Sequence, residues 1–167
     1  MTYEWELYFC LFLGLWSAVI GGVFSAFSEF VMSGLSRSAP AAGIESMQHI
    51  NRTVLKTQFV IGIFVIGIFS VLFAAYSLTV FSGPALITIL LAASIYLLAV
   101  FLMTLLGHVP MNNKLDALEH TSREAERYWA HYARVWTKLN HARYIGCVLT
   151  AGLYTTAAIT LMTSGQV

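Results

Sequence analysis

Four long apolar segments and two long polar connections dominate the pattern along the chain. The apolar segments cover residues 7–30, 58–81, 85–106 and 144–162, and the connections cover residues 31–57 and 107–143. Each segment has roughly 19–24 residues, enough at about 1.5 Å per residue to cross ~30 Å of hydrocarbon. The pattern predicts an all-α integral membrane protein, a four-helix bundle in which residues 1–167 form a single domain.

Both polar connections carry apolar residues at helical spacing. Met47, Ile50 and Val54 recur along residues 41–56, which predicts a short helix that runs into the second span. Aromatic and charged positions alternate along residues 112–140, as in a cytoplasmic amphipathic helix that lies in the interface plane or docks under the bundle. We expect this helix to continue without a break into the fourth span.

Glycine and proline mark further features of the bundle. The stretch "FSGPAL" predicts a tight turn that joins the second and third spans as an antiparallel hairpin. The glycines in "LGLWSAVIGGVFSAF" and "VIGIFVIGIF" favour close helix packing in lipid rather than breaks. The stretch "GHVPMNNK" is predicted to end the third span at Pro110, and its asparagines either cap the next helix or line a site.

The composition supports a membrane protein. The chain is 58% hydrophobic and 10% charged, with a mean hydropathy of +0.74, whereas a soluble domain has roughly 25% charged residues. No basic stripe for nucleic acid is present. Cys10 and Cys147 lie in apolar runs and are interpreted as small hydrophobic residues. The acidic start "MTYEWELYF" lacks signal-peptide features, so we expect the first apolar segment to be retained.

The basic residues predict the orientation. All nine lie in the two long connections or at the edge of the fourth span, and cytoplasmic segments carry an excess of Lys and Arg. We therefore expect a multi-pass protein of the inner (cytoplasmic) or another cellular membrane, with both termini on the non-cytoplasmic side. The basic residues are Arg37, Arg52, Lys56, Lys114, Arg123, Arg127, Arg134, Lys138 and Arg143.

Polar side chains gather at the predicted cytoplasmic ends of the spans. In an antiparallel bundle they converge at one membrane depth and cap an apolar cavity, which is how many small-molecule pockets are built. Candidates for a catalytic base are Glu29, His49 and His141. Candidates for substrate binding are Asn51, Asn112, Asn113, Trp129, Tyr132, Trp136, Asn140 and Arg143.

Each candidate also has a purely structural interpretation. Glu29 can pair with Arg52 or Arg143 at the interface, and His108 can be an interfacial residue at a span end. Trp129, Tyr132 and Trp136 share a helix face that leads to Asn140 and Arg143, which fits either an aromatic-walled entrance or an aromatic belt with a snorkelling arginine. A metal site would have to be assembled from separate segments, because no HxxxH, HxxE or CxxC spacing occurs. Its candidate ligands are Glu29, His49, His108 and His141.

Four stretches, "GGVFSAFSEFVMSGLSR", "GIESMQHINRTV", "HVPMNNKLDAL" and "WTKLNHAR", together resemble the anthrone-oxygenase-like family of small four-span membrane proteins. The resemblance runs from about Gly14 to Met162, and "VPMNN" and W-x-x-x-N-x-x-R are its most specific parts. It implies oxidation of an anthrone to an anthraquinone by O₂ without a bound organic cofactor, and it leaves a metal or haem open. Such a reaction needs a base, donors aimed at a developing oxyanion and a dry apolar pocket.

Three functions remain open on these residues. The first is an oxygenase acting on a hydrophobic polycyclic or quinone-like small molecule. The second is a non-catalytic binder or carrier of a lipid or quinone, and the third is a structural partner subunit. The expected partners are membrane lipid and a hydrophobic small molecule, and a homodimer would cover the outer helix faces.

Overall fold

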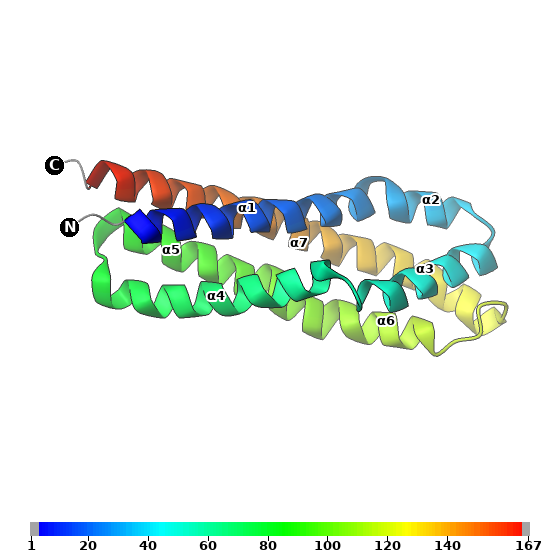
Figure 1. Cartoon of the computed structure of the whole chain (residues 1–167). Helices are drawn as coiled ribbons and strands as arrows, with labels where there is room; N and C mark the ends of the chain where they lie inside the picture. Colours follow the sequence, from blue (N-terminus) through cyan, green and yellow to red (C-terminus); the bar gives the residue numbers. More distant parts are fainter. Residues whose placement is uncertain (1–3, 165–167) are drawn as a thin grey trace.

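The computed structural model describes residues 4–164, in which four long helical rods lie side by side (Figure 1). Residues 1–3 and 165–167, which belong to the predicted non-cytoplasmic ends, lie outside this range. The first rod is α1 (Glu4–Ala26), η1 (Phe27–Val31) and α2 (Met32–Arg37), and the second is α4 (Gln58–Val80). The third is α5 (Gly83–Ile95), η2 (Tyr96–Leu102), η3 (Thr104–His108) and α6 (Val109–Asp116), and the fourth is α7 (Arg123–Ser164).

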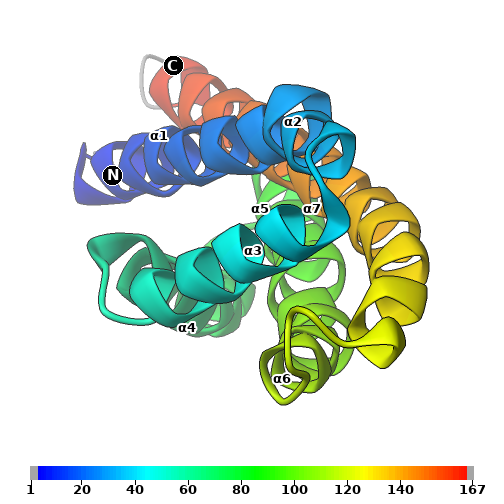
Figure 2. The same ribbon diagram turned by 90° about the vertical axis from the view of Figure 1, so that its right-hand side faces the viewer.

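All four rods are long and apolar enough to cross a membrane, as the hydrophobic pattern predicts. The beginning of α1, the α4–α5 turn and the end of α7 lie at one end of the molecule (Figure 1). At the other end α3 (Pro40–Val54) contacts α2, α6 and α7 (Figure 2). We call this second end, formed by α2, α3, α6 and residues 123–143, the polar end.

The third rod is longer than the sequence suggests. Pro110 was expected to end the helix, but it lies in the first turn of α6, and the rod continues to Asp116. The segments η2 and η3 that precede it are π-helical. A π turn shifts the backbone hydrogen bonds by one residue, which makes room where a proline ring would clash with a regular helix. The polar stretch after the third span is therefore helical and extends the bundle.

The fourth rod confirms one prediction and corrects its boundary. Helix α7 runs from its polar first half into its apolar second half without a break over 42 residues. It starts at Arg123 rather than near Asn112, because residues 117–122 form a loop. The loop ends at Ser122, whose Oγ accepts a hydrogen bond of 3.1 Å from the Ala125 N–H. This is the usual side-chain cap of a helix N-terminus.

Small residues bring α7 close to its neighbours. A Cβ placed on Gly21 would lie 2.9 Å from Cβ of Cys147, and one on Gly146 would lie 2.8 Å from Cβ of Ala99. Both distances are shorter than side chains normally approach. The glycines therefore allow α1 and the α5–η2 rod to pack directly on α7, as small residues do between helices in lipid.

The buried side chains form two hydrophobic clusters. The larger one fills the space between the apolar rods and includes Ile20, Ile66 and Tyr154. The smaller one lies within the polar end and includes Met47 and Trp136. The candidate site lies where these two clusters meet.

Candidate functional site

A cavity of about 190 Å³ lies where the apolar rods join the polar end. Side chains from α1, η1, α3, α4, η3, α6 and α7 form its walls, and most of them are hydrocarbon. A few polar groups on apolar walls are the usual composition of a small-molecule site. The polar lining residues are Asn51, Thr104, His108, Asn112 and Arg143.

Arg143 is a buried cation in the cavity wall, only 5% exposed. Its guanidinium carbon lies 4.1 Å from the ring centroid of Phe24 and 5.4 Å from that of Trp136. Nη2 donates to Asn140 Oδ1 at 2.6 Å and Nη1 to Thr104 Oγ1 at 3.3 Å, while Nε has no hydrogen-bond partner.

All of these contacts of Arg143 are with neutral groups. Within residues 4–164, no carboxylate oxygen lies within 4.0 Å of its guanidinium nitrogens. A buried charge without a counter-ion costs free energy, which an anionic partner would recover. The guanidinium is therefore placed to receive a ligand that carries or develops negative charge.

His108 presents an unpaired ring nitrogen in the same wall. The side chain is 1% exposed, and its ring packs edge-on against Trp136 with 5.0 Å between centroids. Nδ1 lies 3.2 Å from the Met103 carbonyl oxygen. Because a carbonyl only accepts, we assign the hydrogen to Nδ1. In the neutral ring, Nε2 then carries the lone pair, and it is buried without a hydrogen-bond partner. This nitrogen is a basic atom buried beside the cavity, with its surface covered by neighbouring protein atoms.

Asn112 is held by two aromatic residues. Tyr132 Oη donates to Asn112 Oδ1 at 2.8 Å, and Trp136 Nε1 donates to the same oxygen at 3.0 Å. Asn51 Nδ2 donates in turn to Tyr132 Oη at 3.4 Å. An indole nitrogen can only donate, so these contacts determine which side of the amide is oxygen. The amide nitrogen of Asn112 makes no hydrogen bond within the described chain, and it remains a free donor in the cavity wall.

Asn140 ties Arg143 to the first rod. It is fully buried, and its Nδ2 lies 2.6 Å from both the Phe24 carbonyl oxygen and Ser28 Oγ. The Phe24 carbonyl lies just before the π turn η1, and π turns change which carbonyls the helix itself can satisfy. Asn140 does not line the cavity. It positions the guanidinium from behind the wall.

Three apolar side chains mark the mouth of the cavity. Leu55, Phe64 and Val109 line it, and they are 69%, 37% and 37% exposed. They come from the α3–α4 connection, α4 and α6. The mouth therefore opens at the side of the helix bundle and has an apolar rim.

The structure brings together only part of the predicted substrate-binding set. Asn140 lies directly behind the cavity, whereas Asn113 is exposed and does not line it. The predicted residues that line the cavity are Asn51, Asn112, Trp136 and Arg143.

The aromatic residues of α7 differ from the predicted entrance. The centroids of Trp129 and Tyr132 are 5.6 Å apart, and those of Tyr132 and Trp136 are 6.3 Å apart. Trp129 and Tyr132 are buried within this stack, and neither lines the cavity. The rings fill the core of the polar end, and Trp136 alone of the three reaches the cavity.

The three predicted bases do not reach the cavity. Glu29, His49 and His141 are all exposed, and none of them lines it. The histidine that lines the cavity is His108, which the sequence suggested only as a metal ligand or an interfacial residue. The sequence shows that His108 follows an apolar span, but the π turns of the third rod determine which way it faces.

The predicted ion pair of Glu29 is absent from residues 4–164. Arg52 pairs instead with Asp116, with 2.7 Å between Nε and Oδ1. Glu29 accepts a hydrogen bond of 2.7 Å from Ser25 Oγ. The carboxylate therefore remains on the outer side of the first rod.

The predicted metal ligands also lie apart. Among residues 4–164, no three His, Cys, Asp or Glu side chains come close enough together to hold a metal ion. His108 is in the cavity wall, while the other three candidates are exposed on other helices. Sequence reasoning also missed Phe24, whose ring covers the guanidinium, and nothing in the sequence distinguishes it from other apolar residues of the first span.

Fold and site together define a multi-pass helical membrane protein with a small, mostly apolar cavity near one end of its spans. The model of a family described as Anthrone oxygenase matches residues 52–153, more than half of the chain, and the chain belongs to this family. The matched range contains His108, Asn112, Trp136 and Arg143, whereas Phe24 and Asn51 precede it. No curated protein and no solved structure matches the chain.

Proposed function

We propose that the protein is a membrane-embedded oxygenase that converts an anthrone, or a similar hydrophobic polycyclic compound, into the corresponding quinone with O₂. The observation that carries this proposal is the buried Arg143 guanidinium, which lines the cavity without a carboxylate partner. His108 Nε2 lies unpaired in the same wall. The reaction needs a base and a hydrogen-bond donor that stabilises an oxyanion, and a cationic donor does this well.

The reaction balances without another oxidant: anthrone and O₂ give anthraquinone and water. Removal of a proton from the central methylene leaves a carbanion, whose charge delocalises onto the carbonyl oxygen. One electron passes to O₂, and the two radicals combine to form a C–O bond. The resulting peroxide is protonated and loses water, which breaks its O–O bond and the remaining C–H bond and leaves the second carbonyl.

Three polar groups of the wall have a place in this reaction sequence. His108 Nε2 takes the methylene proton and returns it to the peroxide. Arg143 and the free amide nitrogen of Asn112 stabilise the oxyanion while the carbanion exists. Because these donors are held by Asn140, Tyr132 and Trp136, little reorganisation is needed during the reaction.

The shape of the cavity supports a hydrophobic substrate. About 150 Å³ holds one benzene-sized ring, so 190 Å³ encloses only part of a polycyclic molecule. The rest extends through the mouth at Leu55, Phe64 and Val109 into the lipid. Such a substrate reaches the site from the bilayer, where both it and O₂ dissolve well.

We further propose that the polar end faces the cytoplasm. Lys and Arg concentrate in the segments of this end, as the positive-inside rule requires. The third and fourth rods are 34 and 42 residues long, far more than the ~20 needed to cross hydrocarbon. Their polar halves therefore extend beyond the membrane and place the cavity near the inner interface.

The test is a turnover assay on purified protein in detergent. The appearance of anthraquinone from anthrone in air-saturated buffer is measured, and the spontaneous rate is subtracted. Loss of a general base typically costs 10²–10⁴-fold, so we expect His108→Gln to lower kcat/KM by at least ~100-fold. His49→Gln, a matched change of an exposed histidine outside the cavity, should leave the rate within about twofold.

Two results would contradict the proposal. If wild-type protein does not exceed the spontaneous rate but binds anthraquinone in an Arg143-dependent manner, the cavity belongs to a carrier rather than an enzyme. If His108→Gln and His49→Gln retain the same rate, His108 is not the base. His108→Ala, with His108→Gln as the isosteric partner, separates loss of the base from loss of packing.

A further inference from the structure

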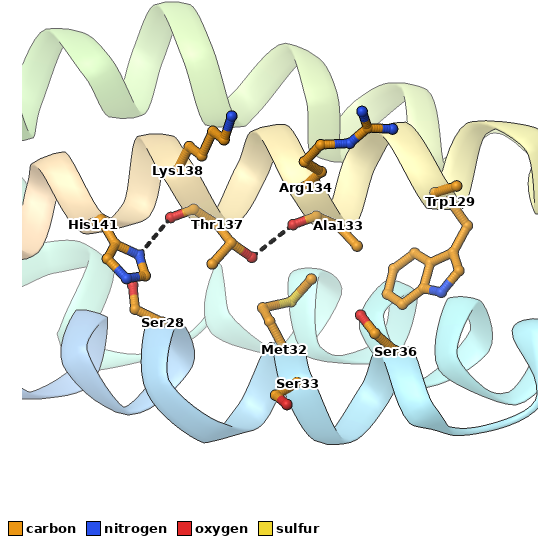
Figure 3. A pocket seen from close by; sticks show the side chains of 11 residues that line it. Ser28, Met32, Ser33, Ser36, Trp129, Ala133, Arg134, Thr137, Lys138 and His141 are labelled. Atoms are coloured by element: carbon orange, nitrogen blue, oxygen red, sulfur yellow. Dashed lines mark hydrogen bonds between the residues drawn. The ribbon is translucent and has the colours of Figure 1, made fainter.

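A second hollow lies beside α7, on a face of the helix next to the one that lines the cavity. It is a groove of about 720 Å³ between α7 and the η1–α2 part of the first rod (Figure 3). None of its lining residues lines the cavity. Met32 and Trp129 contribute apolar surface to it, and both are largely buried. The rest of the lining is mainly small or basic, and its chemistry differs from that of the cavity.

Helix α7 contributes the basic side of the groove. Arg134, Lys138 and His141 all line it, and all three are exposed. Within residues 4–164, neither Arg134 nor Lys138 has a carboxylate within 4.0 Å, and no Asp or Glu lines the groove. His141 Nδ1 bonds to the Thr137 carbonyl, so Nε2 is the ring nitrogen that this bond does not use. The groove thus offers positive charge without any built-in anion.

The facing rod contributes hydroxyl groups. Ser28, Ser33 and Ser36 line the groove, and Figure 3 shows Ser28 next to the His141 ring. Ser28 Oγ accepts from Asn140 Nδ2 at 2.6 Å, so its own hydrogen stays available. The hydroxyls of Ser33 and Ser36 make no hydrogen bond within the described chain. Serine hydroxyls on the first rod and the long side chains of Arg134 and Lys138 on α7 together offer a donor set that suits the oxygens of a phosphate.

Toward the C-terminus, the face of α7 that carries the basic side chains becomes apolar. At about 100° per residue, Arg134, Lys138, His141, Ile145 and Val148 lie within roughly 80° of one another. Ile145 and Val148 are 52% and 50% exposed. At about 1.5 Å per residue, Lys138 and Arg134 lie roughly 10 Å and 16 Å beyond Ile145 along the axis. This spacing matches the step from acyl chains to the headgroup layer.

We propose that the groove is a binding site for the phosphate of an anionic phospholipid. The phosphate lies against Arg134 and Lys138 and accepts from the serine hydroxyls of the first rod. The acyl chains run along Ile145 and Val148. A soluble phosphate would use the same donors but not the adjacent apolar face, which is why a lipid is the occupant we infer. This inference depends on the membrane location and not on the proposed oxygenase activity.

The experiment is native mass spectrometry of the full-length chain in detergent, titrated with phosphatidylglycerol or phosphatidylcholine. We expect wild-type protein to prefer phosphatidylglycerol. The variant Arg134→Gln/Lys138→Gln should lower its affinity about tenfold and leave the weak binding of phosphatidylcholine unchanged. The matched control is Arg123→Gln/Arg127→Gln, which removes the same charge from α7 outside the groove and should stay within about twofold.

A second variant tests the groove from its other wall. Ser33→Asp places a carboxylate among the donors without touching α7, and Ser33 is exposed, so folding should not suffer. We expect it to weaken phosphatidylglycerol binding about as much as the double variant. Equal affinity for the two lipids, or equal losses in the groove and control variants, would overturn the proposal. Displacement of phosphatidylglycerol by millimolar inorganic phosphate would also overturn it, because the site would then take a soluble anion.

Discussion

Helix α7 presents an arginine to each of two hollows, and the surroundings give the two arginines opposite properties. Arg143 is buried against Phe24 and Trp136, with hydrogen bonds to neutral groups. Arg134 is exposed along an open groove. Water stabilises the charge of Arg134 whether or not a ligand is bound, whereas Arg143 gains much more from an anion in its cavity. Burial rather than residue type therefore separates a candidate reaction site from a surface contact.

Two histidines repeat this contrast: His108 on the third rod and His141 on α7. His108 Nδ1 bonds to a backbone carbonyl of its own helix five residues earlier, and His141 Nδ1 bonds to one four residues earlier. The bond is nearly the same, but His108 is buried with Nε2 unpaired and His141 is exposed. A base in a dry cavity acts on its ligand without competition from water. The local sequence around each histidine does not reveal this difference.

The largest expected effect is the difference in turnover between replacing Arg143 and replacing Arg134 by glutamine. Removal of one oxyanion donor typically costs 10²–10³-fold, so Arg143→Gln should lower kcat/KM for anthrone about 100-fold. Arg134→Gln should change it less than twofold, because Arg134 lies in the groove. Steady-state oxidation rates of the two purified variants measure the contrast. Similar losses in both would mean that general surface charge, and not the cavity, controls the rate.

A smaller effect is expected from the network that holds Asn112. Tyr132→Phe removes the Oη donor to Asn112 and leaves Asn51 without its acceptor, which should cost about 1 kcal/mol of stability and several-fold in kcat. Tyr128→Phe is the matched control, because its hydroxyl makes a 3.3 Å bond to the Met111 carbonyl away from the cavity. Thermal unfolding in detergent and turnover are measured together. Equal turnover in the two variants would show that the reaction does not depend on how Tyr132 holds Asn112.

The smallest effect should come from the exposed pair of Arg52 and Asp116. Their side chains are 55% and 40% exposed, and exposed ion pairs contribute roughly 0.2–1 kcal/mol. A double-mutant cycle with Arg52→Ala and Asp116→Ala, followed by thermal unfolding, should give a coupling energy in this range with unchanged turnover. A coupling of several kcal/mol would show that the pair is shielded from solvent more than its exposure indicates.

Much of the fold could be predicted from the sequence because hydrocarbon length and periodicity are local properties. The four apolar rods follow from runs of apolar residues, and the unbroken α7 follows from the absence of proline from residues 123–164. The end of the third rod could not be predicted in this way. Pro110 normally stops a helix, and here the preceding π turns accommodate it within the rod.

The candidate site was predictable in its depth and only partly in its members. Asn51, Asn112 and Arg143 were chosen because they lie near span ends, and Trp136 because it shares a helix face with Arg143. The structure places all four in one wall. His49, Glu29 and His141 share that depth but face outward.

Depth along the membrane follows from the number of residues between each side chain and its apolar span, so the chain alone determines it. The direction in which a side chain faces follows from helix rotation. That rotation is set by contacts between rods, such as Gly21 against Cys147 and Gly146 against Ala99, and by the π turns η1 and η3. Only the packed tertiary structure therefore decides that Arg143 and His108 share a cavity while His141 faces the groove, because a rotation of roughly 100° moves a side chain to its neighbour's position.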